Sequence, residues 1–142
     1  MNQADMTLDL EQHIEVNAPI EEVFDGVVKQ FSERSTRPDG EAMPLTLELR
    51  PGGRWFRDLG DGTGHLWGNV QVVKQPNLLE ISGPLFMSYP AINHVQVRLQ
   101  DEGGRTRVTL RHRALGMIEP DHRSGVTSGW ENYLNNIKRH CE

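Results

Sequence analysis

The sequence contains a single cysteine, Cys141, next to the last residue. One thiol cannot form an internal disulfide, so a disulfide-stapled scaffold is excluded and a reducing compartment is expected. No stretch approaches the roughly 20 apolar residues of a membrane span. The first residues lack the basic start and apolar run of a signal peptide. The sequence therefore predicts a cytoplasmic protein that does not engage a membrane.

Basic residues are also few, with 15 Lys and Arg against 20 Asp and Glu, which gives a formal charge of −5. Nucleic-acid binding depends on clustered Lys and Arg that neutralise phosphates, so a nucleic-acid partner is not expected. The 142 residues are 36% hydrophobic and 25% charged, as in ordinary globular proteins. Length and composition together predict one domain covering residues 1–142.

Metal and phosphate motifs are missing. The six histidines are scattered without a short ligand spacing, so neither a metal site nor another cofactor is predicted. The glycine-rich residues 60–64 are followed by no lysine and no helical pattern, which is typical of a hairpin turn and not of a phosphate-binding loop.

Apolar periodicity predicts the first two elements. Residues 8–16 alternate apolar and polar side chains, which indicates a half-buried strand. Residues 20–31 have apolar side chains at helical spacing, with Pro19 at the start and acidic Glu21 and Glu22 in the first turn, which indicates an amphipathic helix. The region 32–44 has no periodicity and is expected to be a loop.

The remainder reads as about six strands followed by one long helix. Alternating segments separated by Gly and Pro turns continue to residue 112, and helical spacing resumes over residues 126–141. Consecutive hairpins with one apolar face form an antiparallel sheet. The order of strand, helix, strands and helix predicts an α+β fold in which a curved sheet of about seven strands grips the last helix, with an apolar pocket between them.

Four segments resemble a known family. They are residues 17–24, residues 49–55, residues 68–70 ahead of Pro76, and Gly129-Trp130 in the last helix. In this order they are similar to the SRPBCC (START and Bet v 1-like) superfamily, in the branch of the C-terminal domain of the activator of Hsp90 ATPase. The resemblance implies a helix-grip fold whose deep cavity takes a small apolar or amphipathic molecule. The Hsp90 activator has a separate N-terminal domain that contributes to chaperone binding, and nothing comparable precedes residue 8, so a chaperone partner is not expected.

Candidate ligand-binding residues follow from these patterns. His112 has the parity of Val108 and Leu110 and should point inward, either as a core histidine bonded to backbone or to Tyr133, or as a ligand contact. Gly125 and Gly129 are expected to leave room beside the sheet-facing side of the last helix. The predicted set is Trp55, Phe86, Tyr89, His112, Trp130 and Tyr133.

Two aromatic features have more than one interpretation. The turn at Gly52-Gly53 can shift the register, so Trp55 faces either the cavity or solvent. Trp67 has the parity of Asn69 and faces outward unless a bulge intervenes. The apolar residues 83–90 either cap the pocket, form a homodimer contact, or continue two strands around a bulge.

Three functions remain open from the sequence. The first is a module that binds a small apolar molecule. The second is an enzyme of the cyclase, dehydratase or hydrolase kind, in which His112 acts with Tyr89 or His94 as proton-transfer groups. The third is a protein-interaction module, co-chaperone-like or a homodimer, built on residues 84–90 and an exposed Trp67.

Overall fold

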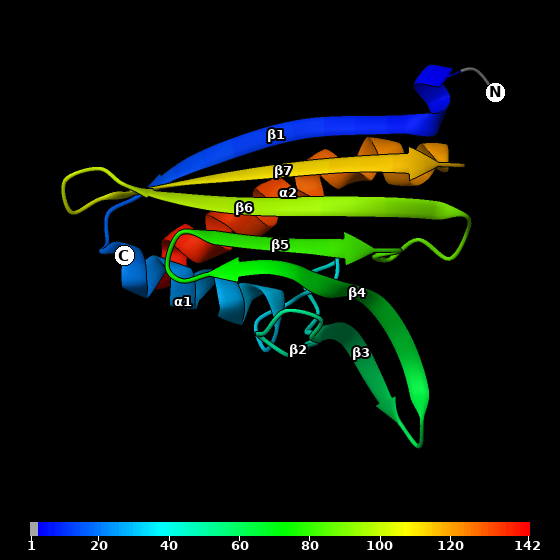
Figure 1. Cartoon of the computed structure of the whole chain (residues 1–142), viewed down its shortest axis with the longest axis horizontal. Helices are drawn as coiled ribbons and strands as arrows, with labels where there is room; N and C mark the ends of the chain where they lie inside the picture. The colour runs from blue at the N-terminus through cyan, green and yellow to red at the C-terminus, as the bar shows by residue number, and fades with distance from the viewer. Residues whose placement is uncertain (1–2) are drawn as a thin grey trace.

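The computed structural model describes residues 3–142 and contains one seven-stranded antiparallel sheet with both α-helices on the same face (Figure 1). The strand order is β1-β7-β6-β5-β4-β3-β2, so every neighbouring pair except β1 with β7 is consecutive in the chain. After a short 3-10 turn (Gln3–Met6) the elements are β1 (Thr7–Val16), α1 (Ile20–Phe31), β2 (Thr46–Leu47), β3 (Arg54–Gly60), β4 (Thr63–Lys74), β5 (Leu78–Gly83), β6 (Ala91–Asp101), β7 (Thr106–Gly116) and α2 (Pro120–Cys141). The predicted α+β helix-grip fold is confirmed.

Helix α1 occupies the predicted residues, because its apolar side chains repeat at 3.6-residue spacing. Val23, Val27 and Phe31 are buried, whereas Glu21 and Glu22 lie exposed in the first turn, where negative charge is favourable. The preceding Pro19 has an extended backbone and needs no amide hydrogen bond there.

Helix α2 starts at Pro120, six residues before the predicted start at 126. Its buried stripe of Val126, Trp130, Leu134 and Ile137 packs over the apolar face of the sheet, and the helix also lies against β1 and α1. Two side chains fix it to β1: Gln12 Nε2 donates to the Thr127 carbonyl oxygen at 2.8 Å, and Lys138 Nζ donates to the Glu15 carbonyl oxygen at 2.9 Å. The helix is therefore held along the first edge of the sheet.

The outward orientation predicted for Trp67 is wrong, because strand β4 carries a bulge at this residue. Trp55 pairs with Gly68 and Phe56 pairs with Leu66, so Trp67 is the extra residue between two successive pairs. An extra residue reverses the alternation on one side of the bulge. Trp67 is thus 8% exposed and lies in the core, and it is not available as an outer partner surface.

Strands β4 and β5 approach each other closely beside this bulge. A Cβ on Gly83 would lie 2.4 Å from Gly68 Cα and 2.6 Å from the Trp67 carbonyl oxygen. Backbone atoms cannot yield as a side chain does, so Gly83→Ala is expected to lower the free energy of unfolding by about 2 kcal/mol. Urea denaturation measures the loss. The matched control is Gly129→Ala on α2, where a Cβ meets nothing within 4 Å and alanine should stabilise the helix by about 0.5–1 kcal/mol. Equal effects of the two substitutions would contradict the close approach.

Candidate functional site

Trp55 lies at the centre of the space between the sheet and the helices. Its side chain is 0% exposed, and Nε1 donates a hydrogen bond to the Phe31 carbonyl oxygen at 2.6 Å. The Trp55 ring centroid lies 5.2 Å from that of Phe31 and 5.1 Å from that of Trp67. Of the two orientations left open by the sequence, the inward one is therefore correct.

Helix α2 presents Trp130 and Tyr133 to the same aromatic cluster. The Phe31 ring centroid lies 5.9 Å from Trp130 and 5.7 Å from Tyr133. The Tyr133 hydroxyl forms a short hydrogen bond with the buried Ser35 hydroxyl, in the loop after α1. Burial raises the pKa of Tyr133, so the phenol stays protonated. Gly125 and Gly129 are exposed and line no part of this cluster.

His112 is a fully buried histidine with a protein partner on each ring nitrogen. Trp130 Nε1 donates to His112 Nδ1 at 2.9 Å, so the proton of the neutral ring sits on Nε2, which donates to Asn93 Oδ1 at 2.7 Å. Burial lowers the pKa of His112 to about 4. The inward orientation predicted from parity is correct, but the expected partners, backbone or Tyr133, are wrong.

Asn93 extends the His112 network to the loop between β5 and β6. Its Nδ2 donates to the carbonyl oxygens of Gly83 and Pro84, both at 3.2 Å. The chain of bonds from Trp130 through His112 and Asn93 therefore ties α2 to the start of this loop. Because all these polar groups are satisfied, the network fixes the position of the two elements.

The loop of residues 84–90 closes one end of the aromatic cluster. Leu85 and Met87 are each 3% exposed, and the half-buried Phe86 ring lies 5.9 Å from Trp67 and 5.2 Å from His122. The segment lies between the end of β5 and the start of β6, so the interpretation that it continues two strands around a bulge is wrong. That it caps a pocket or forms a homodimer contact stays a prediction. Residues 84–90 are called the capping loop below, because they close this end of the cluster.

Tyr89 contacts His122, a residue that was not in the predicted ligand-binding set. Its hydroxyl lies 2.6 Å from His122 Nδ1, and the two rings stack with centroids 5.4 Å apart. His122 belongs to the part of α2 that precedes the predicted helix. It lies four residues before Val126, so helical spacing extended by one turn would have identified it.

His94 lies apart from the other candidates. Neighbouring residues on a strand point to opposite faces, and Val95, not His94, is the β6 residue paired with His112. His94 Nε2 instead contacts Glu80 Oε1 at 2.8 Å on the outer face of the sheet. The predicted acid–base pairing of His112 with His94 is therefore wrong. Tyr89 contacts His122 and not His112.

Three linking residues join the six predicted ligand-binding residues into one network of ring contacts. Phe31 bridges Trp55 to the α2 pair, Trp67 bridges Trp55 to Phe86, and His122 bridges Phe86 to Tyr89. His112 joins through Trp130, at a centroid distance of 5.7 Å. Within residues 5–142, no buried side-chain nitrogen or oxygen lacks a hydrogen-bond partner. The cluster is consequently an aromatic interior with its polar tips paired by the protein itself.

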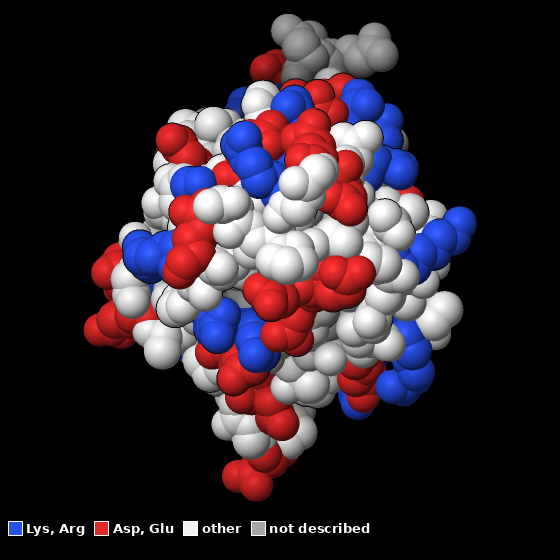
Figure 2. Space-filling model, turned by 90° about the vertical axis from the view of Figure 1, so that its left-hand side faces the viewer, with Lys and Arg blue, Asp and Glu red and all other residues white. Residues whose placement is uncertain are grey.

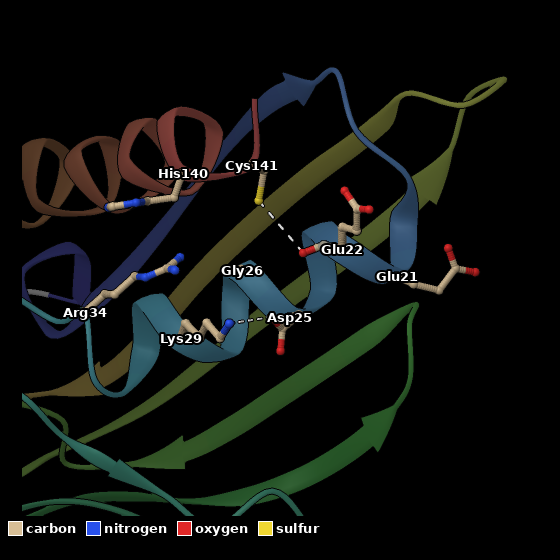
Figure 3. Close-up of a pocket in the computed structure, with 8 residues that line it drawn as sticks. All are labelled: Glu21, Glu22, Asp25, Gly26, Lys29, Arg34, His140 and Cys141. Carbon is tan, nitrogen blue, oxygen red and sulfur yellow. Dashed lines mark hydrogen bonds and ion pairs between the residues drawn. The ribbon is translucent and has the colours of Figure 1, made fainter.

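A pocket opens away from this cluster, between α1 and the end of α2 (Figure 3). Its volume is about 380 Å³, and no residue of the predicted ligand set lines it. Gly26 leaves space for the Cys141 thiol, whose Sγ would lie 2.6 Å from a Cβ at that position. Burial raises the pKa of this thiol. The residues that line this pocket are Glu21, Glu22, Asp25, Gly26, Lys29, Arg34, His140 and Cys141.

Acidic and basic side chains alternate over the end of the molecule seen in Figure 2, and that face has no continuous basic area of the kind that binds nucleic acid. Among the described residues, no group of three or more His, Cys, Asp or Glu side chains could hold a metal ion. No α-helix in residues 3–142 has the length and apolarity needed to cross a membrane.

Solved structures share this fold at low sequence identity. A protein from Chromobacterium violaceum, CV1439, is 14% identical with a TM-score of 0.75, covering 94% of this chain and 96% of its own. Ara h 8.0201 is 11% identical with a TM-score of 0.68, and the match covers 95% of this chain and 97% of Ara h 8.0201. The di-domain ARO/CYC protein StfQ, from the steffimycin biosynthetic pathway, is 12% identical with a TM-score of 0.68, covering 98% of this chain but only 52% of its own. No curated protein matches the sequence.

The family is identified by a profile match that spans most of the chain. Residues 17–142 match the profile described as activator of Hsp90 ATPase homolog 1-like protein. That range begins directly after β1 and includes the other six strands, both α-helices and every residue of the aromatic cluster. The resemblance seen in the sequence is confirmed, and the chain belongs to the activator of Hsp90 ATPase homolog 1-like family.

Proposed function

We propose that this protein binds a small planar molecule, apolar or amphipathic, between the sheet and α2. The observation that carries the proposal is the continuous aromatic network inside the fold. Its wall is the predicted set of Trp55, Phe86, Tyr89, His112, Trp130 and Tyr133.

The composition of this interior favours a flat, apolar ligand. Ligand pockets are lined mainly by hydrophobic and aromatic side chains with a few polar groups that fix orientation. Here the polar groups lie at the margins of the network, at the hydroxyls of Tyr133 and Tyr89 and in the imidazole of His112. The ring centroids are 5.1 to 5.9 Å apart, so a ligand must separate rings that now touch.

The capping loop offers the shortest route inward. Phe86 and Tyr89 are only half-buried, and both rings contact α2 at His122. Trp55, by contrast, is 0% exposed. Rotation of Phe86 would open a path to Trp67 without moving a strand.

Relatives in fold support a binding role without naming the ligand. StfQ, which shares the fold, is a di-domain ARO/CYC protein from the steffimycin biosynthetic pathway. An acid–base enzyme is less well supported here, because His94 faces away and both nitrogens of His112 are occupied. Binding of a small molecule requires only the aromatic network and no pair of acid–base groups.

N-phenyl-1-naphthylamine is expected to bind in this interior at one molecule per chain. A ligand of this size that gains about 0.4 kcal/mol per heavy atom has a Kd of about 10 μM. All three tryptophans of the sequence, Trp55, Trp67 and Trp130, belong to the network, so binding should quench tryptophan emission while the probe brightens. Fluorescence titration and native mass spectrometry give the affinity and the stoichiometry.

Two variants locate the bound probe. Val126→Phe adds a ring on the buried stripe of α2 and should weaken binding at least tenfold. The control, Leu115→Phe, changes a 62% exposed residue of β7 and should leave the affinity within twofold. Absence of saturable binding, or the same affinity in both variants, would rule out the proposed interior site.

A further inference from the structure

The capping loop contacts the start of α2 through the Tyr89–His122 pair. The Tyr89 hydroxyl lies 2.6 Å from His122 Nδ1, and the rings are inclined by only 20°. The residues are 33 positions apart in the sequence, one on the loop after β5 and one in the first turns of α2. Both side chains are half-buried. The pair therefore lies between the aromatic interior and the solvent.

Aromatic contacts continue inward from this pair without a break. The ring centroids of His122 and Phe86 lie 5.2 Å apart, those of Phe86 and Trp67 5.9 Å apart, and those of Trp67 and Trp55 5.1 Å apart. A planar ligand that takes the place of the Phe86 ring against Trp67 would bring one edge to the imidazole. No other polar pair of the network is this exposed.

The hydrogen bonds of the pair leave one donor unused. The Tyr89 hydroxyl can donate to His122 Nδ1 or accept from it, according to the tautomer of the imidazole, and the inference takes the tautomer in which the hydroxyl donates. In the neutral imidazole the remaining proton then sits on Nε2. That N–H has no partner among residues 3–142. His112 differs, because protein groups occupy both of its nitrogens.

Charged side chains of both signs lie around the pair. Burial raises the pKa of Tyr89, a hydrogen bond with the Glu119 backbone lowers it, the negative charge of Glu119 raises it and the positive charge of Arg123 lowers it. Asp121 and Arg123 flank His122 in the sequence. With both signs close by, the surroundings favour a neutral oxygen acceptor over a carboxylate or a phosphate.

We infer that the Tyr89–His122 pair recognises the polar edge of the ligand, and that this ligand is a neutral planar aromatic molecule with a hydroxyl or carbonyl oxygen on that edge. His122 Nε2–H donates to this oxygen, and Tyr89 holds the imidazole in the orientation and tautomer that present the donor. The inference depends on the proposed function, because the aromatic part of the ligand occupies the interior described there.

Equilibrium dialysis with 2-naphthol and 2-methylnaphthalene tests the inference. The two compounds have nearly the same shape, and only 2-naphthol carries an oxygen. His122→Phe keeps an aromatic ring against Phe86 and Tyr89 but removes the donor. It is expected to weaken 2-naphthol binding about tenfold, the worth of one good hydrogen bond, and to leave 2-methylnaphthalene within twofold. The control, His94→Phe, alters a histidine on the outer face and should change neither affinity.

A second variant keeps the test decisive if His122→Phe does not fold. Tyr89→Phe removes a single oxygen, and it should weaken 2-naphthol binding threefold or more without affecting 2-methylnaphthalene. If the two compounds lose affinity equally, or neither loses any, while N-phenyl-1-naphthylamine still binds, the recognition role is wrong and the proposed function stands. If the wild-type protein retains none of the three compounds, both proposals fail.

Discussion

Replacing Trp55 with alanine is expected to lower the free energy of unfolding by about 3–5 kcal/mol, the usual cost of truncating a buried aromatic side chain. The indole is 0% exposed and touches Phe31 and Trp67, so its removal leaves a cavity at the centre of the aromatic network. The substitution also removes the donor that satisfies the Phe31 carbonyl oxygen. Urea denaturation followed by far-UV circular dichroism measures the change.

Two further substitutions separate the contributions at this site. Trp55→Phe keeps an aromatic ring but loses the Nε1–H donor, and its cost should fall between those of wild type and Trp55→Ala. Leu66→Ala changes a 49% exposed side chain on the neighbouring strand β4 and should stay within about 0.5 kcal/mol. A loss below about 1 kcal/mol for Trp55→Ala would show that the indole is not central to the packing.

Regular periodicity made the fold predictable from the sequence. Helix α1 has the predicted bounds because its apolar residues repeat without interruption from Ile20 to Phe31. The inward orientation of His112 followed from its parity with Val108 and Leu110, since no bulge interrupts the pairing of β7 with β1 or with β6. Where a strand pairs regularly, alternation alone determines which face each residue occupies.

Trp67 could not be placed in the same way. A bulge depends on how two strands pair, and nothing in the residues around Trp67 specifies that one of them has no partner. The close approach of Gly68 and Gly83 accompanies the bulge, but the two glycines lie 15 positions apart and act only once the strands are paired. Register is a tertiary property, so a one-residue shift reversed the prediction.

The sequence predicted the members of the candidate site but not the contacts between them, because those contacts depend on tertiary structure. All six aromatic and histidine candidates belong to the network, yet their immediate partners were missed. Asn93 continues the alternation of Val95 and Val97 on β6, a pattern that could have identified it as an inward polar residue beside His112. The contact of Tyr89 with His122 joins a loop to a helix, and no local pattern in the sequence predicts such a meeting.

The stability of the fold is expected to fall as the pH drops from about 6.5 to 4, because of His112. Burial holds its pKa at about 4 in the folded protein, against an ordinary value of 6.5 when the chain is unfolded. Between these values the unfolded chain binds the proton and the folded chain does not, so acid favours unfolding. Above pH 6.5 the neutral His112 makes its full contribution to the free energy of unfolding. Below pH 4 that contribution is lost, and the loss amounts to about 3 kcal/mol, at 1.36 kcal/mol for each pKa unit.

Measurement between pH 7.5 and 5 separates His112 from the carboxylates. Arg54 lowers the pKa of Glu48 to about 2, so that ion pair weakens only in stronger acid. In the chosen window His112 alone should reduce the unfolding free energy by about 2 kcal/mol. His112→Gln cannot titrate, so this variant, although less stable at pH 7.5, should lose most of the pH dependence. The control is the exposed His65 on β4, because the His65→Gln variant should keep the wild-type pH dependence of the unfolding free energy. If His112→Gln retains the wild-type pH dependence, the buried imidazole is not the group that titrates on unfolding, and the network joining α2 to the capping loop does not set the acid stability of the fold.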